Sequence, residues 1–222
     1  MTYLLLFLSV VVGYILALIL KVKEVKHISI FLAFSGAFLL SVTIFELLPE
    51  VYVTPTKDIG IYIIIGILLQ IFLEFFSKGA EHGHVHSHTE KYSFPWLLFI
   101  SLSIHALLEG FPISEDNNLM IGVIIHKIPI ALILSLFFIK ANYSNTITII
   151  FLLLFAFMTP LGNWVSNLEL FTVDQELKIA AITIGIFLHV STTILFESSK
   201  NHKFNLSKMT AVIIAMVLAY FL

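Results

Sequence analysis

Two histidines and a glutamate in the middle of the chain have the residue types and spacing of a metal site. His105 and Glu109 are four residues apart in Ser-Ile-His-Ala-Leu-Leu-Glu-Gly-Phe-Pro, which places both on one face of a helix. His126 follows in Ile-Ile-His-Lys-Ile-Pro, where Pro129 cannot donate to the carbonyl of Ile125 and leaves that oxygen available. Two imidazoles and one carboxylate suit zinc with an open position, and manganese or iron are alternatives. We predict a metal site at His105, Glu109 and His126, although a lone membrane histidine is more often a packing residue.

Further ionisable side chains recur at helical spacing in two other apolar stretches. One stretch contains Glu46 and Glu50, and the other contains His189 and Glu197. Ionisable groups are costly in lipid-spanning helices, so each is a candidate for function. We predict that Glu46, His189 and Glu197 line a hydrated path or act as auxiliary ligands. Hydrogen bonding between helices is the competing interpretation, and Glu50 and Glu197 lie near helix ends, where water can solvate them.

A tract of alternating histidines offers a second kind of metal ligand. It reads Glu81-His-Gly-His-Val-His-Ser-His88, and its imidazoles belong to His82, His84, His86 and His88. Such a tract binds zinc or copper loosely. Because it lacks a hydrophobic face and fixed partners, it suits the buffering or sensing of metal better than a structural site. A merely polar linker is the alternative.

The composition places these residues in a membrane. Of the 222 residues, 59% are hydrophobic and 12% are charged, and the charged share is roughly half that of a soluble domain. The first apolar run, 2–20, has no basic residue before it and is too long for a signal-peptide core, so we expect a retained helix. Cysteine is absent, which excludes thiolate ligands, and the net charge of −2 gives no reason to expect a nucleic-acid partner.

We expect an all-α integral membrane protein with about eight transmembrane helices in a single bundle. His105 and Glu109 fall in the fourth span and His126 in the fifth. A short polar link, 114–118, joins these two spans, so they should be antiparallel neighbours that face each other. The whole chain, 1–222, is predicted to form one transmembrane domain that contains a His-rich loop at 78–93. The predicted spans are 2–20, 28–50, 59–77, 94–113, 119–139, 146–164, 177–197 and 206–222.

The distribution of lysine predicts the orientation of these spans. If the amino terminus is outside, the outside segments contain only Lys57 and Lys178. Positive charge concentrates on the cytoplasmic side of membrane proteins. We therefore expect both termini outside and the His-rich loop in the cytoplasm. The lysines that this arrangement places inside are Lys21, Lys23, Lys26, Lys78, Lys91, Lys140, Lys200, Lys203 and Lys208.

The fourth and fifth predicted spans resemble the signature of the ZIP family of metal transporters. In that family one span carries a His-Asn-x-x-x-Gly-like or His-x-x-x-Glu-Gly pattern, and the next span carries His-Glu-x-Pro-Glu. The matching residues here are His105, Glu109 and Gly110, followed by His126 and Pro129. The resemblance implies an eight-helix fold with both termini outside. It also implies a metal path bounded by the central helices. Our leading hypothesis is the movement of zinc, or a related divalent cation, toward the cytoplasm.

The resemblance extends over essentially the whole chain. Gly36-Ala-Phe-Leu followed by Glu46-Leu-Leu-Pro-Glu50 is similar to the second span of the family, with Glu46 where a histidine is often found. The helix count, the His-rich loop after the third span and the short link between the fourth and fifth spans are similar as well.

Three residues depart from the family pattern. Ala106 stands at the usual asparagine position, and Lys127 and Ile130 replace the two glutamates of the fifth-span motif. Because those positions help to form a two-metal centre in the family, the resemblance implies a single-ion site here. We expect Lys127 to tune the charge of that site. Its side chain could point away, pair with a carboxylate such as Glu46, or lose its proton when a metal enters.

Other functions stay open at this stage. A haem-binding electron-transfer protein could use His105, His126 and His189 as ligands, and a degenerate family member could bind metal without transporting it. No P-loop and no His-Glu-x-x-His motif occurs in the sequence, so we expect neither an ATP-driven pump nor an enzyme. The expected partners are the lipid bilayer and a divalent ion, and a homodimer is left open. The lack of arginine and the high lysine, isoleucine and phenylalanine content are typical of an AT-rich bacterial genome. We therefore expect the protein in a bacterial inner (plasma) membrane.

Overall fold

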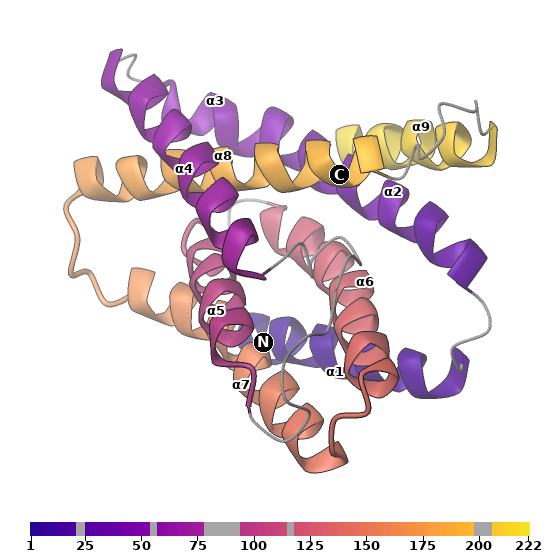
Figure 1. Cartoon of the computed structure of the whole chain (residues 1–222). Helices are drawn as coiled ribbons and strands as arrows, with labels where there is room; N and C mark the ends of the chain where they lie inside the picture. Colours follow the sequence, from indigo (N-terminus) through magenta and orange to yellow (C-terminus); the bar gives the residue numbers. More distant parts are fainter. Residues whose placement is uncertain (21–24, 54–56, 78–93, 115–117, 198–205) are drawn as a thin grey trace.

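The computed structural model describes residues 1–20, 25–53, 57–77, 94–114, 118–197 and 206–222. Within these ranges the chain forms helices and no strand (Figure 1). In chain order the elements are α1 (Thr2–Leu20), α2 (Val25–Val42), the π-helix η1 (Thr43–Leu47), α3 (Leu48–Val51), α4 (Lys57–Ser77), α5 (Trp96–Gly110), α6 (Leu119–Lys140), α7 (Asn145–Ser166), α8 (Val173–Glu197) and α9 (Leu206–Tyr220).

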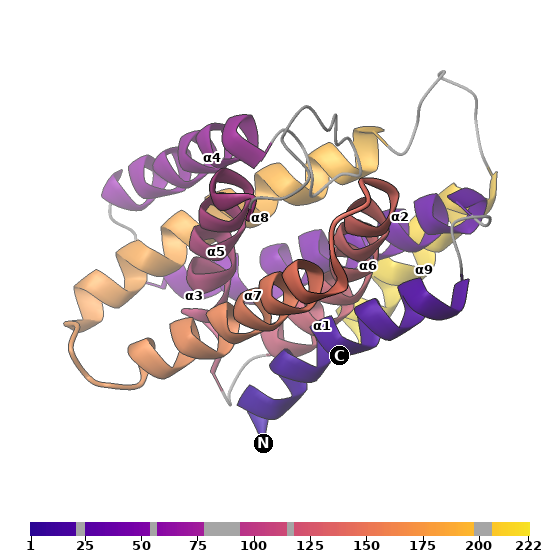
Figure 2. The same ribbon diagram turned by 60° about the horizontal axis from the view of Figure 1, so that its bottom comes forward.

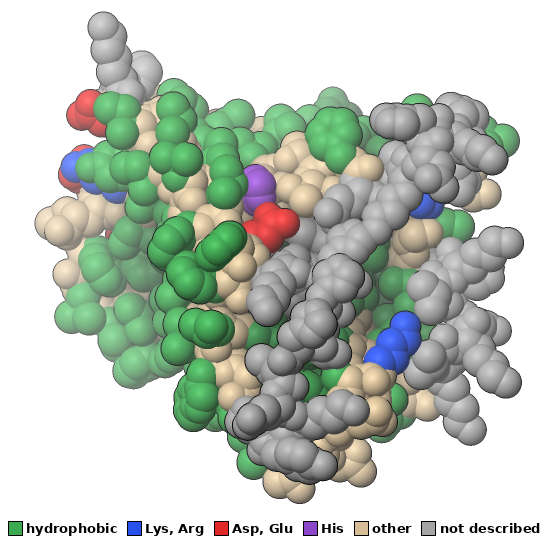
Figure 3. Space-filling view, in the orientation of Figure 1, with side chains coloured by type: hydrophobic (Ala, Val, Ile, Leu, Met, Phe, Trp, Pro, Cys, Tyr) green, Lys and Arg blue, Asp and Glu red, His purple; other side chains and the backbone are tan. Residues whose placement is uncertain are grey.

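The length and polarity of these helices are those of membrane spans. Within the described residues, six helical segments are long and apolar enough to cross a bilayer, and α5 and α9 are shorter apolar helices. Large hydrophobic side chains such as Phe75 and Phe196 are exposed, and hydrophobic side chains cover much of the face in Figure 3. A surface of this kind is stable in lipid rather than in water. The prediction of an all-α membrane protein is confirmed.

The second predicted span is one continuous rod made of α2, η1 and α3, but it is not α-helical throughout. Pro49 lies in the first turn of α3 and has no N–H to donate to the carbonyl of Phe45. The helix is widened to π geometry just before it, at Thr43–Leu47. Short π segments occur frequently at functional positions. In this rod the π segment contains Glu46.

The seventh span begins earlier than predicted. Helix α8 starts at Val173 rather than near residue 177. The backbone N–H of Gln175 donates to Thr172 Oγ1 over 3.3 Å, and the backbone N–H of Thr172 donates to Gln175 Oε1 over 2.9 Å. This reciprocal capping box satisfies N–H groups at the start of the helix. Its Thr-x-x-Gln pattern was readable in the sequence.

Helices of the described part of the chain cross in close contact at glycines. A Cβ on Gly110 of α5 would collide with the carbonyl of Thr159 in α7, and one on Gly162 of α7 would collide with the carbonyl of Leu107 in α5. Helices α4 and α8 meet in the same way, through Gly66 and Gly185. Small residues let membrane helices approach until their backbones touch. These crossings determine the depth and rotation of α5 and α4.

The helices form two groups that meet in the middle of the molecule. Helices α1, α5, α6 and α7 pack mainly with one another, as do α2, α4, α8 and α9. Figures 1 and 2 show the two groups on opposite sides of the bundle. Contacts of α4 with α5, and of α2 with α6, join the groups. The predicted metal ligands lie on α5 and α6 and so lie next to this junction.

Candidate metal centre

Helix α5 buries the face that carries two of the predicted ligands. Its buried side chains are Leu98, Ser101, Leu102, His105, Ala106, Glu109 and Gly110. Spacings of three and four residues define one face of an α-helix. The predicted sharing of a face by His105 and Glu109 is confirmed. The close glycine crossing with α7 holds this face toward the interior.

Helix α6 is the most buried of the six long spans. His126, Lys127 and Ile130 are all buried, and Pro129 lies inside the helix without ending it. A helix surrounded on every side by protein exposes little side-chain surface to lipid. Adjacent residues such as His126 and Lys127 can therefore both point into the protein.

His105, Glu109 and His126 converge in the interior. Each offers one ligand atom, and these atoms all lie within 4.8 Å of one another. All three side chains are buried, and the two imidazole rings are 6.4 Å apart between centroids. Tetrahedral zinc with bonds of about 2.1 Å would hold its ligand atoms about 3.4 Å apart, so a small inward adjustment suffices. The structure thus brings the predicted ligand set together.

Lys127 forms an ion pair inside this cluster. Its Nζ lies 2.8 Å from Glu109 Oε2, and the two side chains are only 2% and 1% exposed. The same Nζ lies 4.7 Å from the ring centroid of Phe155, within the range of a cation–π contact. The considered pairing of Lys127 with a carboxylate is found, and the carboxylate is that of Glu109 rather than the example, Glu46. Glu46 accepts instead from Asn118 Nδ2, over 3.3 Å.

The two oxygens of Glu109 have different surroundings. Thr159 Oγ1 donates to the carbonyl of Ala106 over 2.8 Å and lies 3.4 Å from Glu109 Oε2, the oxygen that Lys127 also contacts. Glu109 Oε1 is buried and receives no hydrogen bond from the described residues. A buried carboxylate oxygen without a donor is costly, and a bound cation would relieve that cost. Oε1 is therefore the oxygen available to a metal.

A side chain that the sequence interpretation missed contacts the first ligand. Gln70 of α4 is fully buried, and its Oε1 lies 3.1 Å from His105 Nδ1. The signal for Gln70 was present, because it is an uncharged polar residue in the middle of an apolar span. Thr159 gave no comparable signal, since threonine is common in membrane helices and often bonds its own backbone.

Another predicted polar residue, His189, pairs with a side chain of α4 rather than with this cluster. His189 Nε2 lies 2.7 Å from Glu74 Oε2, and both side chains are about one-fifth exposed. Glu74 is one helical turn after Gln70 on α4. Glu197 is the last residue of α8, and its side chain is outside the described part. The loop 78–93, with His82, His84, His86 and His88, also lies outside the described residues.

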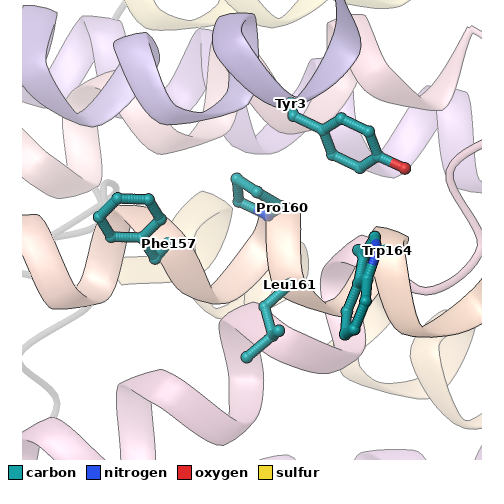
Figure 4. A pocket seen from close by; sticks show the side chains of 5 residues that line it. All are labelled: Tyr3, Phe157, Pro160, Leu161 and Trp164. Carbon is teal, nitrogen blue, oxygen red and sulfur yellow. The ribbon is translucent and has the colours of Figure 1, made fainter.

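An apolar groove lies between α1 and α7, apart from the cluster. It has a volume of about 280 Å³ and is lined by Tyr3, Phe157, Pro160, Leu161 and Trp164. Figure 4 shows these side chains, with Tyr3 on α1 and the others on α7. None of the five is a carboxylate or an imidazole, so the groove lacks the donors that a divalent cation requires.

Comparison with known families identifies a match over the second part of the chain. The family model of the ZIP zinc transporters matches residues 78–222. The chain belongs to the ZIP family. The matched range contains α5 to α9 with all three predicted ligands, whereas α1 to α4 precede it. Comparison with curated proteins gave no match.

Membership of the ZIP family narrows the functions left open by the sequence. ZIP proteins are transporters rather than enzymes, and the chain is accordingly a membrane transporter of divalent metal ions. The match gives no support to the haem interpretation, because it is to a family of zinc transporters. His189 also pairs with Glu74 instead of joining His105 and His126.

Proposed function

We propose that this ZIP transporter carries zinc, or a related divalent cation, toward the cytoplasm through one central site made of His105, Glu109 and His126. The observation that carries the proposal is the convergence of their ligand atoms within 4.8 Å in the protein interior. The orphan Oε1 of Glu109 gives that site an acceptor for a cation. Two imidazoles and a carboxylate leave a position open for incoming or leaving ligands.

Lys127 tunes this site by adding a positive charge beside it. Without metal, Lys127 and Glu109 neutralise each other across 2.8 Å. A divalent ion adds two positive charges, which the ammonium of Lys127 repels. At a separation of about 5 Å and an effective dielectric of about 20, the Coulomb energy of each pair of unit charges is roughly 3 kcal/mol. This repulsion weakens binding and favours release, which a transport site needs as much as binding. The same repulsion disfavours the binding of a second metal ion next to the first.

Two polar pairs mark the proposed route on either side of the centre. Glu46 and Asn118 lie at the end of α6 that the lysine distribution places outside, and their contact is 3.3 Å. Glu74 and His189 lie toward the end of α4 that it places inside, and their contact is 2.7 Å. Glu197, at the end of α8, would extend the inner side. Ionisable groups at such depths commonly mark ion pathways.

The His-rich tract is proposed to act on the cytoplasmic side of the transporter. It follows α4 directly, and positive-inside topology places it in the cytoplasm. There His82, His84, His86 and His88 would bind released metal loosely and act as a buffer or sensor. The proposed location is the inner membrane of a bacterium, with the chain as a single transmembrane domain and a homodimer as an option.

Zinc flux into proteoliposomes tests the proposal. We expect His105→Ala, Glu109→Gln and His126→Ala each to lower saturable flux by at least about tenfold, because each removes one of three ligands. Ser135→Ala is the matched control. Ser135 is also buried in α6, and its hydroxyl donates to the carbonyl of Ala131 in the same helix. Uptake by intact cells tests the direction.

The same assay separates transport from binding. Zinc binding by calorimetry without any flux would identify a member that binds metal and does not move it. If all three ligand variants carry zinc as the parent does, the proposed site is wrong.

A further inference from the structure

Gln70 contacts His105 from outside the helix group to which His105 belongs. It lies in α4, within an apolar stretch that continues through Ile71, Phe72 and Leu73. Its side chain is fully buried. An amide buried among apolar groups costs free energy unless it is hydrogen-bonded, and lipid offers no water to compensate. One hydrogen-bond partner of Gln70 is the first predicted ligand, His105.

The chemistry of this contact determines which nitrogen of His105 carries the proton. Gln70 Oε1 lies 3.1 Å from His105 Nδ1. An amide oxygen only accepts a hydrogen bond, so a Gln70 amide oriented with Oε1 toward the ring requires the proton on Nδ1. A neutral imidazole with its proton on Nδ1 has its lone pair on Nε2. The nitrogen that is able to bind a metal is then Nε2.

We infer that Gln70 is a positioning residue for the metal centre, which holds His105 in the Nδ1–H form with Nε2 directed at Glu109 and His126. This inference rests on the proposed function for its consequence in transport. Histidines that bind metals generally donate their other ring N–H to an oxygen that fixes the ring, and loss of that oxygen typically costs about 10- to 100-fold in metal affinity. Gln70 supplies this oxygen here.

The contact between Gln70 and His105 joins the two groups of helices. Lys127 and Thr159 contact Glu109 from α6 and α7, which belong to the same helix group as α5. Gln70 reaches His105 from α4, which packs closely on α8 in the other group. The alignment of one ligand thus depends on the docking of α4 against α5. The centre is completed by both helix groups, although its three predicted ligands come from one.

Nitrogen-15 NMR of metal-free protein labelled in histidine tests the hydrogen bond directly. The His105 signals are identified by their loss in His105→Gln. We expect Nδ1 of His105 to be protonated in the parent and in Gln70→Glu, because a carboxylate also accepts. In Gln70→Met, which keeps the length but lacks an acceptor, we expect a mixture of the two forms. Protonation of Nε2 in the parent would overturn the inference, whatever the transport assay gives.

Zinc affinity tests the consequence for the metal centre. We expect Gln70→Met to bind zinc about 10- to 100-fold more weakly and Gln70→Glu to stay within about threefold of the parent. The control is Ser77→Ala, which removes a buried hydroxyl of α4 that bonds its own helix at Glu74. Unchanged affinity and tautomer in Gln70→Met would refute the inference. If the parent has the expected protonated Nδ1 but binds no zinc, the hydrogen-bond role of Gln70 stands. The transport proposal is then refuted.

Discussion

Lys127 and Glu109 form an ion pair in the interior of the transporter, with Nζ 2.8 Å from Oε2 and both side chains almost completely buried. The lysine occupies one oxygen of a predicted metal ligand and leaves the other, Oε1, without a donor among the described residues. A metal and a lysine would therefore share one carboxylate.

Replacing this lysine should strengthen metal binding. Lys127→Met keeps the length of the side chain and removes a positive charge near the site. We expect zinc affinity to rise by at least about tenfold, because a dication and a lysine at about 5 Å repel each other by roughly 3 kcal/mol for each of the two products of unit charges. Release should slow, and maximal flux should fall. Calorimetry and single-turnover flux measure the two effects. An unchanged affinity would mean that Lys127 has a structural role only.

Removing the carboxylate alone should destabilise the fold. Glu109→Gln leaves Lys127 buried without its counter-ion, and breaking one side of a buried pair typically costs about 3–5 kcal/mol. We expect a clearly lower thermal midpoint for Glu109→Gln. The double variant Glu109→Gln/Lys127→Met should recover much of that stability but not zinc flux. Recovery of flux in the double variant would show that Glu109 is not a ligand.

The close crossing of α5 and α7 should be essential for the site. Gly162→Ala places a Cβ against the carbonyl of Leu107, a backbone atom that cannot move aside easily. We expect a lower thermal midpoint and loss of flux, although every ligand is present. Gly60→Ala is the matched control, because its Cβ would meet Tyr52 Oη at an ordinary 3.8 Å. Equal flux and stability in the two variants would contradict this packing.

Deletion of Glu81 to His88 should leave the transport step intact. The tract lacks a hydrophobic face, and we place it in the cytoplasm as a buffer or sensor. We expect the deletion to keep the initial rate of zinc flux into empty vesicles and to change the response of that rate to zinc already inside. Complete loss of flux from a folded and inserted variant would instead make the tract part of the route.

Much of the fold and of the candidate site followed from the sequence alone. Apolar runs of about 20 residues determine membrane helices because lipid cannot satisfy backbone hydrogen bonds in any open structure. The four-residue spacing of His105 and Glu109 determines their common face, and the short link before α6 makes His126 their neighbour. These are local properties, so one sequence suffices to predict them.

Which side chains pair in the interior was decided by the tertiary structure. From the sequence alone, Lys127 could pair with more than one carboxylate. The structure pairs it with Glu109 rather than Glu46. Gln70 lies 35 positions before His105, and they meet because α4 packs on α5. Such pairings depend on the depth and rotation of each helix, which are determined by close crossings such as that of Gly110 and Gly162. The periodicity of a single helix contains no information about its rotation relative to another.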